Sequence, residues 1–411
     1  MSVTRTIRSI ARKSPHAILQ HAVRRWAQRL EVSQLDFVLL ERDLADSRAL
    51  QESGGPEVAS ATNRRRLGWI VVPPGAGSGG HTTLFRMMAA ASAAGFENTL
   101  LFYDRYRGDI HGQTATVRAA WPWLQCEIEA VGDTLDGFDG IVASSWQTAH
   151  VAARRRVPGQ PVVYFVQDFE PYFYPRGSEY ALAEDSYRLG HHNVALGAMV
   201  RDCLWAELSL TADTVPFGCD TAVYRELCPE RERSGVVFYA KRGNERRGHR
   251  LAVLALEQFH RRHPDEPIHV YGDDPGDLPF PVVAHGSLPP ARLNELYNSA
   301  VAGLALSFTN ISLVAEEMLA AGVVPVVNDS PLARADLKNQ HTAWAEATPS
   351  AIAEALSGAV SRSGRASHAR TVAASVTTAP WEETGTRFAD ILTRALSPDT
   401  ATVGAVADVT S

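Results

Sequence analysis

Four cations follow a short apolar segment in the second half of this 411-residue sequence. The segment is 236–240, VVFYA; Lys241 and Arg242 come directly after it, and Arg246 and Arg247 follow a few residues later. Lysine offers a phosphate a point charge, and arginine offers a planar fork that donates two hydrogen bonds. The pattern therefore favours a clamp for a pyrophosphate group. A solvated charged loop would carry the same residues.

A glutamate suited to a nucleotide lies further along the chain. We predict a buried strand over Val301–Phe308, then a loop, then a helix that begins at Leu313 and is stopped by Gly322. A second buried strand, Val323–Val327, closes a βαβ unit with parallel strands. These elements place Glu317 on the first turns of the helix.

The neighbours of Glu317 suggest what it could bind. Ser312 can cap the helix, and the free backbone N–H groups of a first helical turn bind phosphate. A carboxylate beside them can accept hydrogen bonds from ribose hydroxyls. An ordinary solvated helical glutamate is the alternative.

Acids and aromatic residues follow the predicted strand Pro161–Val166. Asp168, Glu170 and Tyr172 are among them, and acids at the carboxyl end of a strand lie where open α/β sheets bind ligands. Such a group suits a sugar acceptor, because carboxylates accept from hydroxyls and aromatic rings stack on the sugar. Asp168 is the candidate for orienting the acceptor or acting as general base. A capping aspartate beside core aromatics would give the same pattern.

A glycine-rich loop follows the first predicted strand, Gly68–Pro74. Gly75, Gly77 and Gly80 satisfy the pattern G-x-G-x-x-G, and Asp104 stands at the end of the next strand. A nicotinamide-dependent oxidoreductase is therefore one alternative function. The pattern alone is weak, because two prolines interrupt the turn from strand to glycine and no other dehydrogenase feature follows.

The first 30 residues carry seven basic side chains and no acid. Apolar residues recur there at helical spacing on both sides of Pro15. Two basic amphipathic helices on an anionic membrane surface are one interpretation. A helical collar packed on the protein itself, or a partner-binding arm, is the other. Residues 44–66 turn polar and predict a linker.

The composition excludes several classes of protein. With 45% hydrophobic and 21% charged residues it is that of a soluble enzyme, and the net charge of −6 argues against a nucleic-acid binder. The four cysteines lack C-x-x-C spacing and clustered histidines, so we expect no disulfide framework or zinc site and a cytoplasmic location. No apolar run reaches the ~20 residues of a membrane-spanning helix, and no signal peptide is expected.

Residues 313–327, LVAEEMLAAGVVPVV, resemble the signature L-V-x-x-E-x-x-A-x-G-x-P-V-V of retaining GT-B glycosyltransferases of family four, with one extra residue after the glycine. That family carries another glutamate eight positions before the one matched by Glu317, and Thr309 stands there in this chain. The rhamnosyltransferases of surface-layer and O-glycan assembly, the WsaF type, share this departure and a similar S-x-T-N loop.

Other segments carry the same resemblance. Residues 166–190, VQDFEPYFYPRGSEYALAEDSYRLG, resemble the WsaF type nearly end to end, and residues 73–87, PPGAGSGGHTTLFRM, are also close. Residues 215–226, VPFGCDTAVYRE, match the crossover between the two GT-B domains, where proline and glycine suit a hinge.

The resemblance implies an α/β fold of the GT-B class, with two Rossmann-like domains facing a cleft and an N-terminal helical extension. The implied parts are a basic amphipathic extension and linker (1–66), an N-terminal acceptor domain (67–215), a C-terminal nucleotide-sugar donor domain (216–378), a helix crossing back to the first domain (379–395) and a disordered tail (396–411).

The resemblance also implies roles for individual residues. Asp168 and Lys241 would be catalytic. The residues expected to bind the donor are Arg246, Arg247, Gly272, His285, Thr309, Asn310, Ser312 and Glu317. The residues expected on the acceptor-side loop are Gly79, Gly80, His81, Glu170 and Tyr172. A helix over Thr82–Ala94 would direct its N-terminus at the donor phosphates.

The implied reaction is the transfer of a sugar, rhamnose from dTDP-rhamnose, to a glycan or lipid-linked glycan of the cell surface, with retention. No D-x-D motif lies at a strand end, so we expect neither a metal nor another cofactor. Expected partners are the donor, the acceptor glycan and, through residues 1–30, the inner face of the plasma membrane, with no nucleic acid. Besides the oxidoreductase, the alternative is a catalytically inactive GT-B scaffold.

Overall fold

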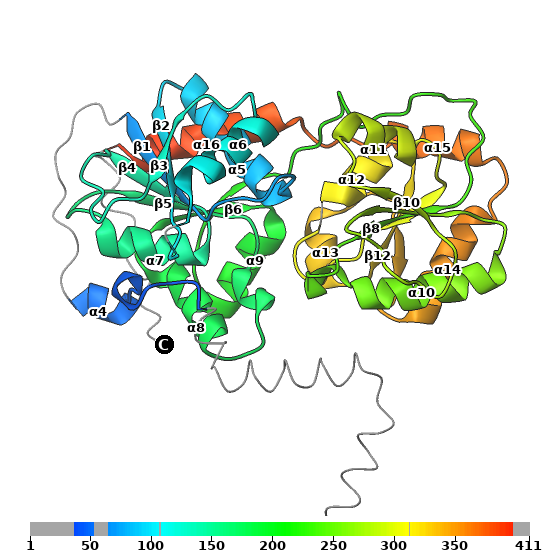
Figure 1. Ribbon diagram of the computed structural model, residues 1–411, viewed down its shortest axis with the longest axis horizontal. Helices are drawn as coiled ribbons and strands as arrows, with labels where there is room; N and C mark the ends of the chain where they lie inside the picture. Colours follow the sequence, from blue (N-terminus) through cyan, green and yellow to red (C-terminus); the bar gives the residue numbers. More distant parts are fainter. Residues whose placement is uncertain (1–36, 53–64, 107, 312, 398–411) are drawn as a thin grey trace, which may run out of the picture. The chain divides into compact units, whose positions relative to one another are not determined.

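The computed structural model of the chain describes residues 37–52, 65–106, 108–311 and 313–397 (Figure 1). The predicted basic extension, the greater part of the linker, Ser312 and the end of the tail lie outside the described residues. The first described elements are the short helices η1 (Glu41–Asp43) and α4 (Ser47–Glu52). None of the helices in the described ranges is long and apolar enough to cross a membrane.

The first domain is built on a parallel sheet with strand order β3-β2-β1-β4-β5-β6-β7. The strands are β1 (Arg66–Val71), β2 (Glu97–Phe102), β3 (Glu127–Ala130), β4 (Gly140–Ala143), β5 (Val162–Val166), β6 (His192–Leu196) and β7 (Asp213–Val215). The helices are α5 (Gly79–Ala93), α6 (Ile110–Ala120), α7 (Trp146–Arg155), η2 (Glu170–Phe173), α8 (Ser178–Asp185), η3 (Ser186–Arg188) and α9 (Ala198–Leu208). Helices α5 and α6 cover one face and α7 and α9 the other (Figure 1), and β4 and β5 are accordingly buried at every position.

The second domain repeats this plan with strand order β10-β9-β8-β11-β12-β13, again parallel. The strands are β8 (Val236–Ala240), β9 (Ile268–Gly272), β10 (Val283–Gly286), β11 (Ala302–Leu304), β12 (Val324–Asn328) and β13 (Ala343–Ala345). The helices are η4 (Glu245–Arg247), α10 (His249–Arg262), α11 (Pro290–Tyr297), α12 (Leu313–Ala320), α13 (Pro331–Asp336), α14 (Pro349–Val360) and α15 (Arg365–Ala374). In both sheets the strand order reverses next to the first strand, at β1/β4 and β8/β11, and open α/β sheets bind ligands at such a point.

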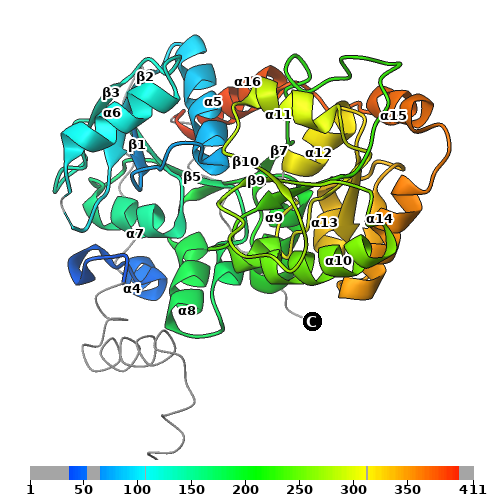
Figure 2. The ribbon, with the colours of Figure 1, turned by 45° about the vertical axis from the view of Figure 1, so that its right-hand side comes forward.

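The last described helix, α16 (Trp381–Ala395), returns to the first domain. It packs on α5, and a Cβ on Gly385 would lie only 2.7 Å from the Cβ of Ala90, so the two helices approach closely there. Phe388 is fully buried, with its ring centroid 6.0 Å from that of Trp69 on β1. Figure 2 shows α16 alongside α5 at the top of the first sheet.

The predicted pair of Rossmann-like domains is confirmed, with two corrections of detail. The strand expected over Val301–Phe308 ends at Leu304, because the Ser307 N–H donates to the side chain of Asn328 (2.7 Å) instead of continuing the sheet. The helix expected from Thr82 begins at Gly79, since Ser78 caps it. The glycines expected in a loop, Gly79 and Gly80, are therefore helical.

Candidate active site

Side chains from both domains meet at one buried carboxylate, Asp168, just beyond the carboxyl end of β5. Its Oδ2 accepts from Arg246 Nη1 (2.7 Å) and from the Thr309 hydroxyl (2.9 Å). Its Oδ1 accepts from the Asn310 N–H (3.3 Å) and the Phe169 N–H (2.9 Å). Arg246 follows β8, and Thr309 and Asn310 lie in the loop beyond β11, so both sheets contribute strand ends. We call Asp168, Arg246, Thr309 and Asn310 the Asp168 cluster.

The carboxylate at the centre of the Asp168 cluster is shielded from water. Asp168 is 5% exposed and Thr309 is 1% exposed. Burial raises the pKa of the Asp168 carboxyl, while the guanidinium groups of Arg246 and Arg247 and the bond from Thr309 oppose this rise. Because four donors converge on it, a charged carboxylate is the form that satisfies them all. A role as general base would require one of these donors to leave, and that role remains a prediction.

Arg247 holds the loop that carries the cluster. Its Nη1 donates to the Ser307 hydroxyl (2.8 Å) and to the Asn310 carbonyl (3.2 Å), and Nη2 donates to Asn310 Oδ1 (3.3 Å). Burial lowers the pKa of Arg247 to about 10. Asn328, at the end of β12, bonds both the N–H and the carbonyl of Ser307 (2.7 Å each). We did not predict Ser307 or Asn328, although both follow or end buried strands where ligands and their supports are expected.

Arg246 remains partly accessible. Its side chain is 27% exposed, and its guanidinium carbon lies 4.0 Å from the centroid of the Phe173 ring. The ring and Asp168 together fix the plane of the guanidinium, and its other N–H groups are not needed for the bond to Asp168. Arg246 can therefore present a preorganised fork to an anionic group at the cluster.

Lys241 lies at the end of β8, paired with an acid that we did not predict. Its Nζ is 3.3 Å from Asp273 Oδ1, and the lysine side chain is 45% exposed. Asp273 also accepts from the Arg242 N–H (3.1 Å). Gly272 precedes it with φ +101°, and a Cβ there would lie 2.5 Å from the Ala240 carbonyl oxygen, so a glycine is needed. An exposed pair of this kind contributes little to stability, so Lys241 can exchange Asp273 for a phosphate.

Glu317 is not an ordinary solvated residue, because it is only partly exposed and its carboxylate lies in a desolvated setting. Burial raises the pKa of Glu317 to about 7; Arg86 opposes this and Asp220 adds to it. Arg86 comes from α5, pairs with Asp220 (3.2 Å) and lies 5.0 Å from the ring centroid of Trp381. Glu317 therefore belongs to the set of charges between the two domains.

His81 and Gly80 lie in the first turn of α5, beside the Asp168 loop. A Cβ on Gly80 would be 3.7 Å from the side-chain oxygen of Gln167. His81 Nε2 lies 3.0 Å from the Val72 carbonyl oxygen, which can only accept, so Nε2 carries the proton and Nδ1 accepts from Ser78 Oγ (2.7 Å). Burial lowers the pKa of His81, so the ring is neutral near pH 7.

Three predicted site residues point elsewhere. Glu170 is 6% exposed, and its oxygens accept from the Trp146 N–H (2.9 Å) and the Tyr164 hydroxyl (3.2 Å) inside the first domain. The Tyr172 hydroxyl donates to Glu207 (3.3 Å). The third, His285, pairs with His269 (3.0 Å) at the outer strands β10 and β9. None of these contacts brings the three side chains to the Asp168 cluster.

Glu170 gives the first testable prediction. Burial raises its pKa to about 8, against ~4.3 in an unfolded chain. Between these values the native state holds one proton more than the unfolded state, so stability falls as pH rises. Glu170→Gln should remove this slope because an amide does not titrate, and its oxygen can still accept from the Trp146 N–H. Glu170→Ala leaves that N–H unpaired and should cost about 1–3 kcal/mol.

Urea unfolding of the three proteins across this pH range is the measurement. Glu354→Gln, at an exposed position on α14, is the matched control. A slope that persists in Glu170→Gln would show that the carboxyl titrates normally and is not an interior group.

No three His, Cys, Asp or Glu side chains of the described ranges gather as a metal site. The expectation of a metal-independent reaction stays a prediction.

Comparison with known proteins finds matches to one family in two parts of the chain. The models of the WsaF N-terminal and C-terminal domains match residues 135–198 and 234–357. The O-antigen biosynthesis protein RfbC of Myxococcus xanthus is 28% identical over an alignment of 358 positions that covers 81% of this chain. The chain spans only 27% of the length of that relative.

Solved structures agree on the fold. A glycosyltransferase from Rickettsia africae has a TM-score of 0.60 at 12% identity, covering 82% of this chain and all of that one. Anabaena HepE, in complex with UDP and glucose, has a TM-score of 0.61 at 14% identity, and the match covers 80% of this chain and 100% of HepE. WaaG, a glycosyltransferase involved in lipopolysaccharide biosynthesis, has a TM-score of 0.55 at 14% identity, and the match covers 80% of this chain and 99% of WaaG. With the models of both WsaF domains matched in the expected order, the chain is similar to the WsaF type, and its architecture is the GT-B fold.

Proposed function

We propose that this chain transfers a sugar from a nucleotide-sugar donor to a glycan acceptor in the assembly of a cell-surface polysaccharide. The observation that carries the proposal is the Asp168 cluster, in which the strand ends of two Rossmann-like domains share one buried carboxylate. Arg246 presents its guanidinium at this junction. The RfbC relative acts in O-antigen biosynthesis, which supports the polysaccharide context.

The donor diphosphate is proposed to lie between Lys241 and Arg246. Both follow β8, and one is exposed while the other is fixed by Asp168 and Phe173. Their charges, with the N-terminus of α12, would stabilise the diphosphate as it leaves. Electrostatic stabilisation of this kind supplies most of the rate enhancement in many enzymes. The HepE structure, which holds UDP, supports a nucleoside diphosphate as the leaving group.

Rhamnose as the sugar, and retention at its anomeric carbon, are the finer parts of the proposal. They are supported by the match to both WsaF domains and by Thr309, which stands where family-four enzymes carry a glutamate. Thr309 donates its hydroxyl proton to Asp168, so the pair would meet the sugar as a neutral hydroxyl and a carboxylate. Asp168 is proposed to orient the acceptor or act as its base.

Glu317 is proposed to accept hydrogen bonds from the ribose hydroxyls, which gives the second prediction. Since its pKa is raised to about 7, the carboxylate is half protonated at neutral pH. Affinity for a UDP-sugar, whose diphosphate has no proton to lose in this range, should therefore rise from about pH 6 to about pH 8 by roughly tenfold, the worth of one charged hydrogen bond.

Glu317→Gln should bind the UDP-sugar weakly and equally at both pH values. Its melting temperature should barely change, because glutamine keeps the shape and the helix propensity. Calorimetric titration of both proteins is the measurement. An unchanged pH dependence in Glu317→Gln would remove the ribose assignment.

Two other functions compete with this one. A nicotinamide-dependent oxidoreductase should bind NADH in preference to UDP or dTDP in a direct titration. A catalytically inactive GT-B scaffold should bind nucleotide without turnover. Incubation with dTDP-rhamnose and UDP-sugars, followed by mass spectrometry of the nucleotide and glycan products, separates the enzyme from the scaffold.

The basic segment 1–30 is proposed to hold the enzyme at the inner face of the plasma membrane, on the basis of its seven cations and absence of acids. The third prediction follows. Deleting residues 1–30 should release the protein from anionic vesicles and leave transfer to a soluble acceptor unchanged. Sedimentation at low and high salt is the measurement. Full-length protein that stays in the supernatant at low salt would contradict the proposal.

A further inference from the structure

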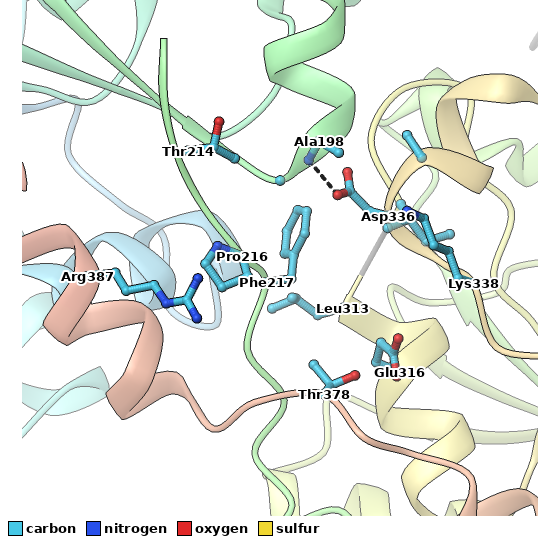
Figure 3. Close-up of a pocket in the computed structure, with 13 residues that line it drawn as sticks. Ala198, Thr214, Pro216, Phe217, Leu313, Glu316, Asp336, Lys338, Thr378 and Arg387 are labelled. Carbon is cyan, nitrogen blue, oxygen red and sulfur yellow. Dashed lines mark hydrogen bonds between the residues drawn. The ribbon is translucent and has the colours of Figure 1, made fainter.

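A cavity opens between the two domains, and one of its lining residues is Ile311, the neighbour of Asn310 in the Asp168 cluster. It has a volume of about 440 Å³, within the range of about 300–1,000 Å³ found for small-molecule sites. Its walls come from the start of α9, the connector at Phe217, the start of α12 and the segment after α13, together with Thr378 and Arg387 (Figure 3). Both domains and both connectors therefore shape it.

Two of its acids differ in what they can offer a ligand. Both carboxylate oxygens of Asp336 already accept hydrogen bonds at the start of α9, Oδ1 from the Ala198 N–H (2.6 Å) and Oδ2 from the Met199 N–H (3.0 Å). Glu316 still has an oxygen that can accept from a ligand. Its Oε2 is buried without a hydrogen-bond partner among the described residues. Burial raises the pKa of Glu316, opposed by a bond from Thr378. A buried oxygen without a donor costs free energy that a ligand hydroxyl would recover.

The cavity also holds cations. Lys338 is exposed and forms no ion pair within the described part of the chain. It is one of only three lysines in the sequence, and another is Lys241 at the proposed donor site. Arg387 is paired with Glu383 (2.6 Å). Free donors and free acceptors therefore face the same space, with no excess of either charge.

The cavity is also lined by an aromatic ring, that of Phe217. Phe217 stands between the start of α9 and Leu313 (Figure 3). Gly197 makes room for it, because a Cβ there would lie 2.6 Å from the Phe217 ring and 2.7 Å from Asp336 Oδ2. Gly197 also has φ +86°, which favours glycine. The local backbone thus permits an aromatic surface beside hydrogen-bonding groups.

We propose that this cavity is a saccharide-binding subsite for the acceptor glycan, with Glu316 accepting from one sugar hydroxyl, Lys338 donating to another and Phe217 packing on the ring. A neutral polyhydroxyl ligand both donates and accepts, which suits this mixture of groups. An anion would be opposed by Glu316 and a cation by Lys338 and Arg387. Ile311 and Leu313 line the cavity, so the cavity adjoins the loop that carries Thr309 and Asn310. The proposal rests on the proposed function.

The test is a ligand-observed NMR titration of the full-length chain with methyl α-rhamnoside, methyl α-glucoside and rhamnose disaccharides, with dTDP present in excess. We expect a glycoside to bind, and its Kd to rise about tenfold in Glu316→Gln and in Lys338→Ala. The Kd for dTDP should be unchanged. Glu354→Gln and Arg362→Ala, at exposed positions elsewhere on the second domain, are the matched controls.

Several results would overturn the inference. One is that no glycoside binds, and another is that the variants bind the glycoside as tightly as the unchanged chain does. The third is that a nucleotide sugar displaces the glycoside, which would place the glycoside in the donor site. Lys338 is exposed, so its variant keeps the test valid even where Glu316→Gln fails to fold. Failure of dTDP to bind would instead count against the proposed function.

Discussion

Asp168→Asn should lower sugar transfer by about two decades or more, because a displacement of about 1 Å in the groups that Asp168 positions can cost about a hundredfold in rate. Asparagine keeps the shape of aspartate but turns one acceptor oxygen into an NH₂ group. At the place of Oδ2 that group would face the Arg246 guanidinium and the Thr309 hydroxyl, and at the place of Oδ1 it would face two backbone N–H groups; all of them now donate to Asp168. Arg246 would lose its counter-charge, and the loop of Thr309 and Asn310 would lose its anchor on the first domain.

The measurement is kcat/KM for a nucleotide sugar, with the melting temperature as a second readout. Each domain has its own hydrophobic core, so we expect the melting temperature to change much less than the transfer rate. Asp390→Asn, at an exposed position on α16, should transfer sugar normally. Transfer by Asp168→Asn at the rate of the unchanged chain would show that the cluster only joins the domains.

Lys241→Ala should weaken use of the donor by roughly one to two decades, since a charge-assisted hydrogen bond contributes about 1.5–3 kcal/mol. In the absence of a donor the lysine pairs with Asp273 at 3.3 Å. Removing it leaves that carboxylate facing the incoming diphosphate, which adds repulsion to the lost attraction. Lys241→Arg should retain part of the activity, because the positive charge remains but the compact ammonium group is replaced by a larger, planar guanidinium.

Calorimetric titration with a nucleoside diphosphate, at low and high salt, is the measurement for Lys241. We expect a smaller salt dependence in Lys241→Ala than in the unchanged chain. Arg362→Ala, which also removes an exposed cation from the second domain, should bind the nucleotide normally. Equal affinity in Lys241→Ala would place the diphosphate elsewhere.

The elements that could be predicted from the sequence are those with a strong local signal. Residues 236–240 are all apolar between polar neighbours, and β8 has these same bounds. Gly322, with φ +80°, follows α12 as predicted. Two of the strands that we did not predict, β3 and β10, carry no such run. β3 is EIEA with every residue at least partly exposed, and β10 is mostly exposed at the end of its sheet.

The site was harder to predict because its contacts are distant in sequence. The loops that carry Asp168 and Thr309 could each be identified because they follow predicted strands. The hydrogen bonds from Arg246 and Thr309 to Asp168, however, span 78 and 141 residues of sequence. The sequence also does not show which way a side chain turns. Asp168 and Glu170 are two residues apart, yet one joins the domains while the other bonds Trp146 and Tyr164 inside the first.

The measurement that tests the central claim most directly is donor cleavage by the full-length chain and by Asp168→Asn. Both proteins would be incubated with dTDP-rhamnose and UDP-sugars, with and without glycan acceptors, and the released nucleoside diphosphate and glycosides identified by mass spectrometry. We predict that the unchanged chain releases nucleoside diphosphate from at least one donor and that Asp168→Asn does so about a hundredfold more slowly. Cleavage of no donor, or equal cleavage by both proteins, would contradict the account.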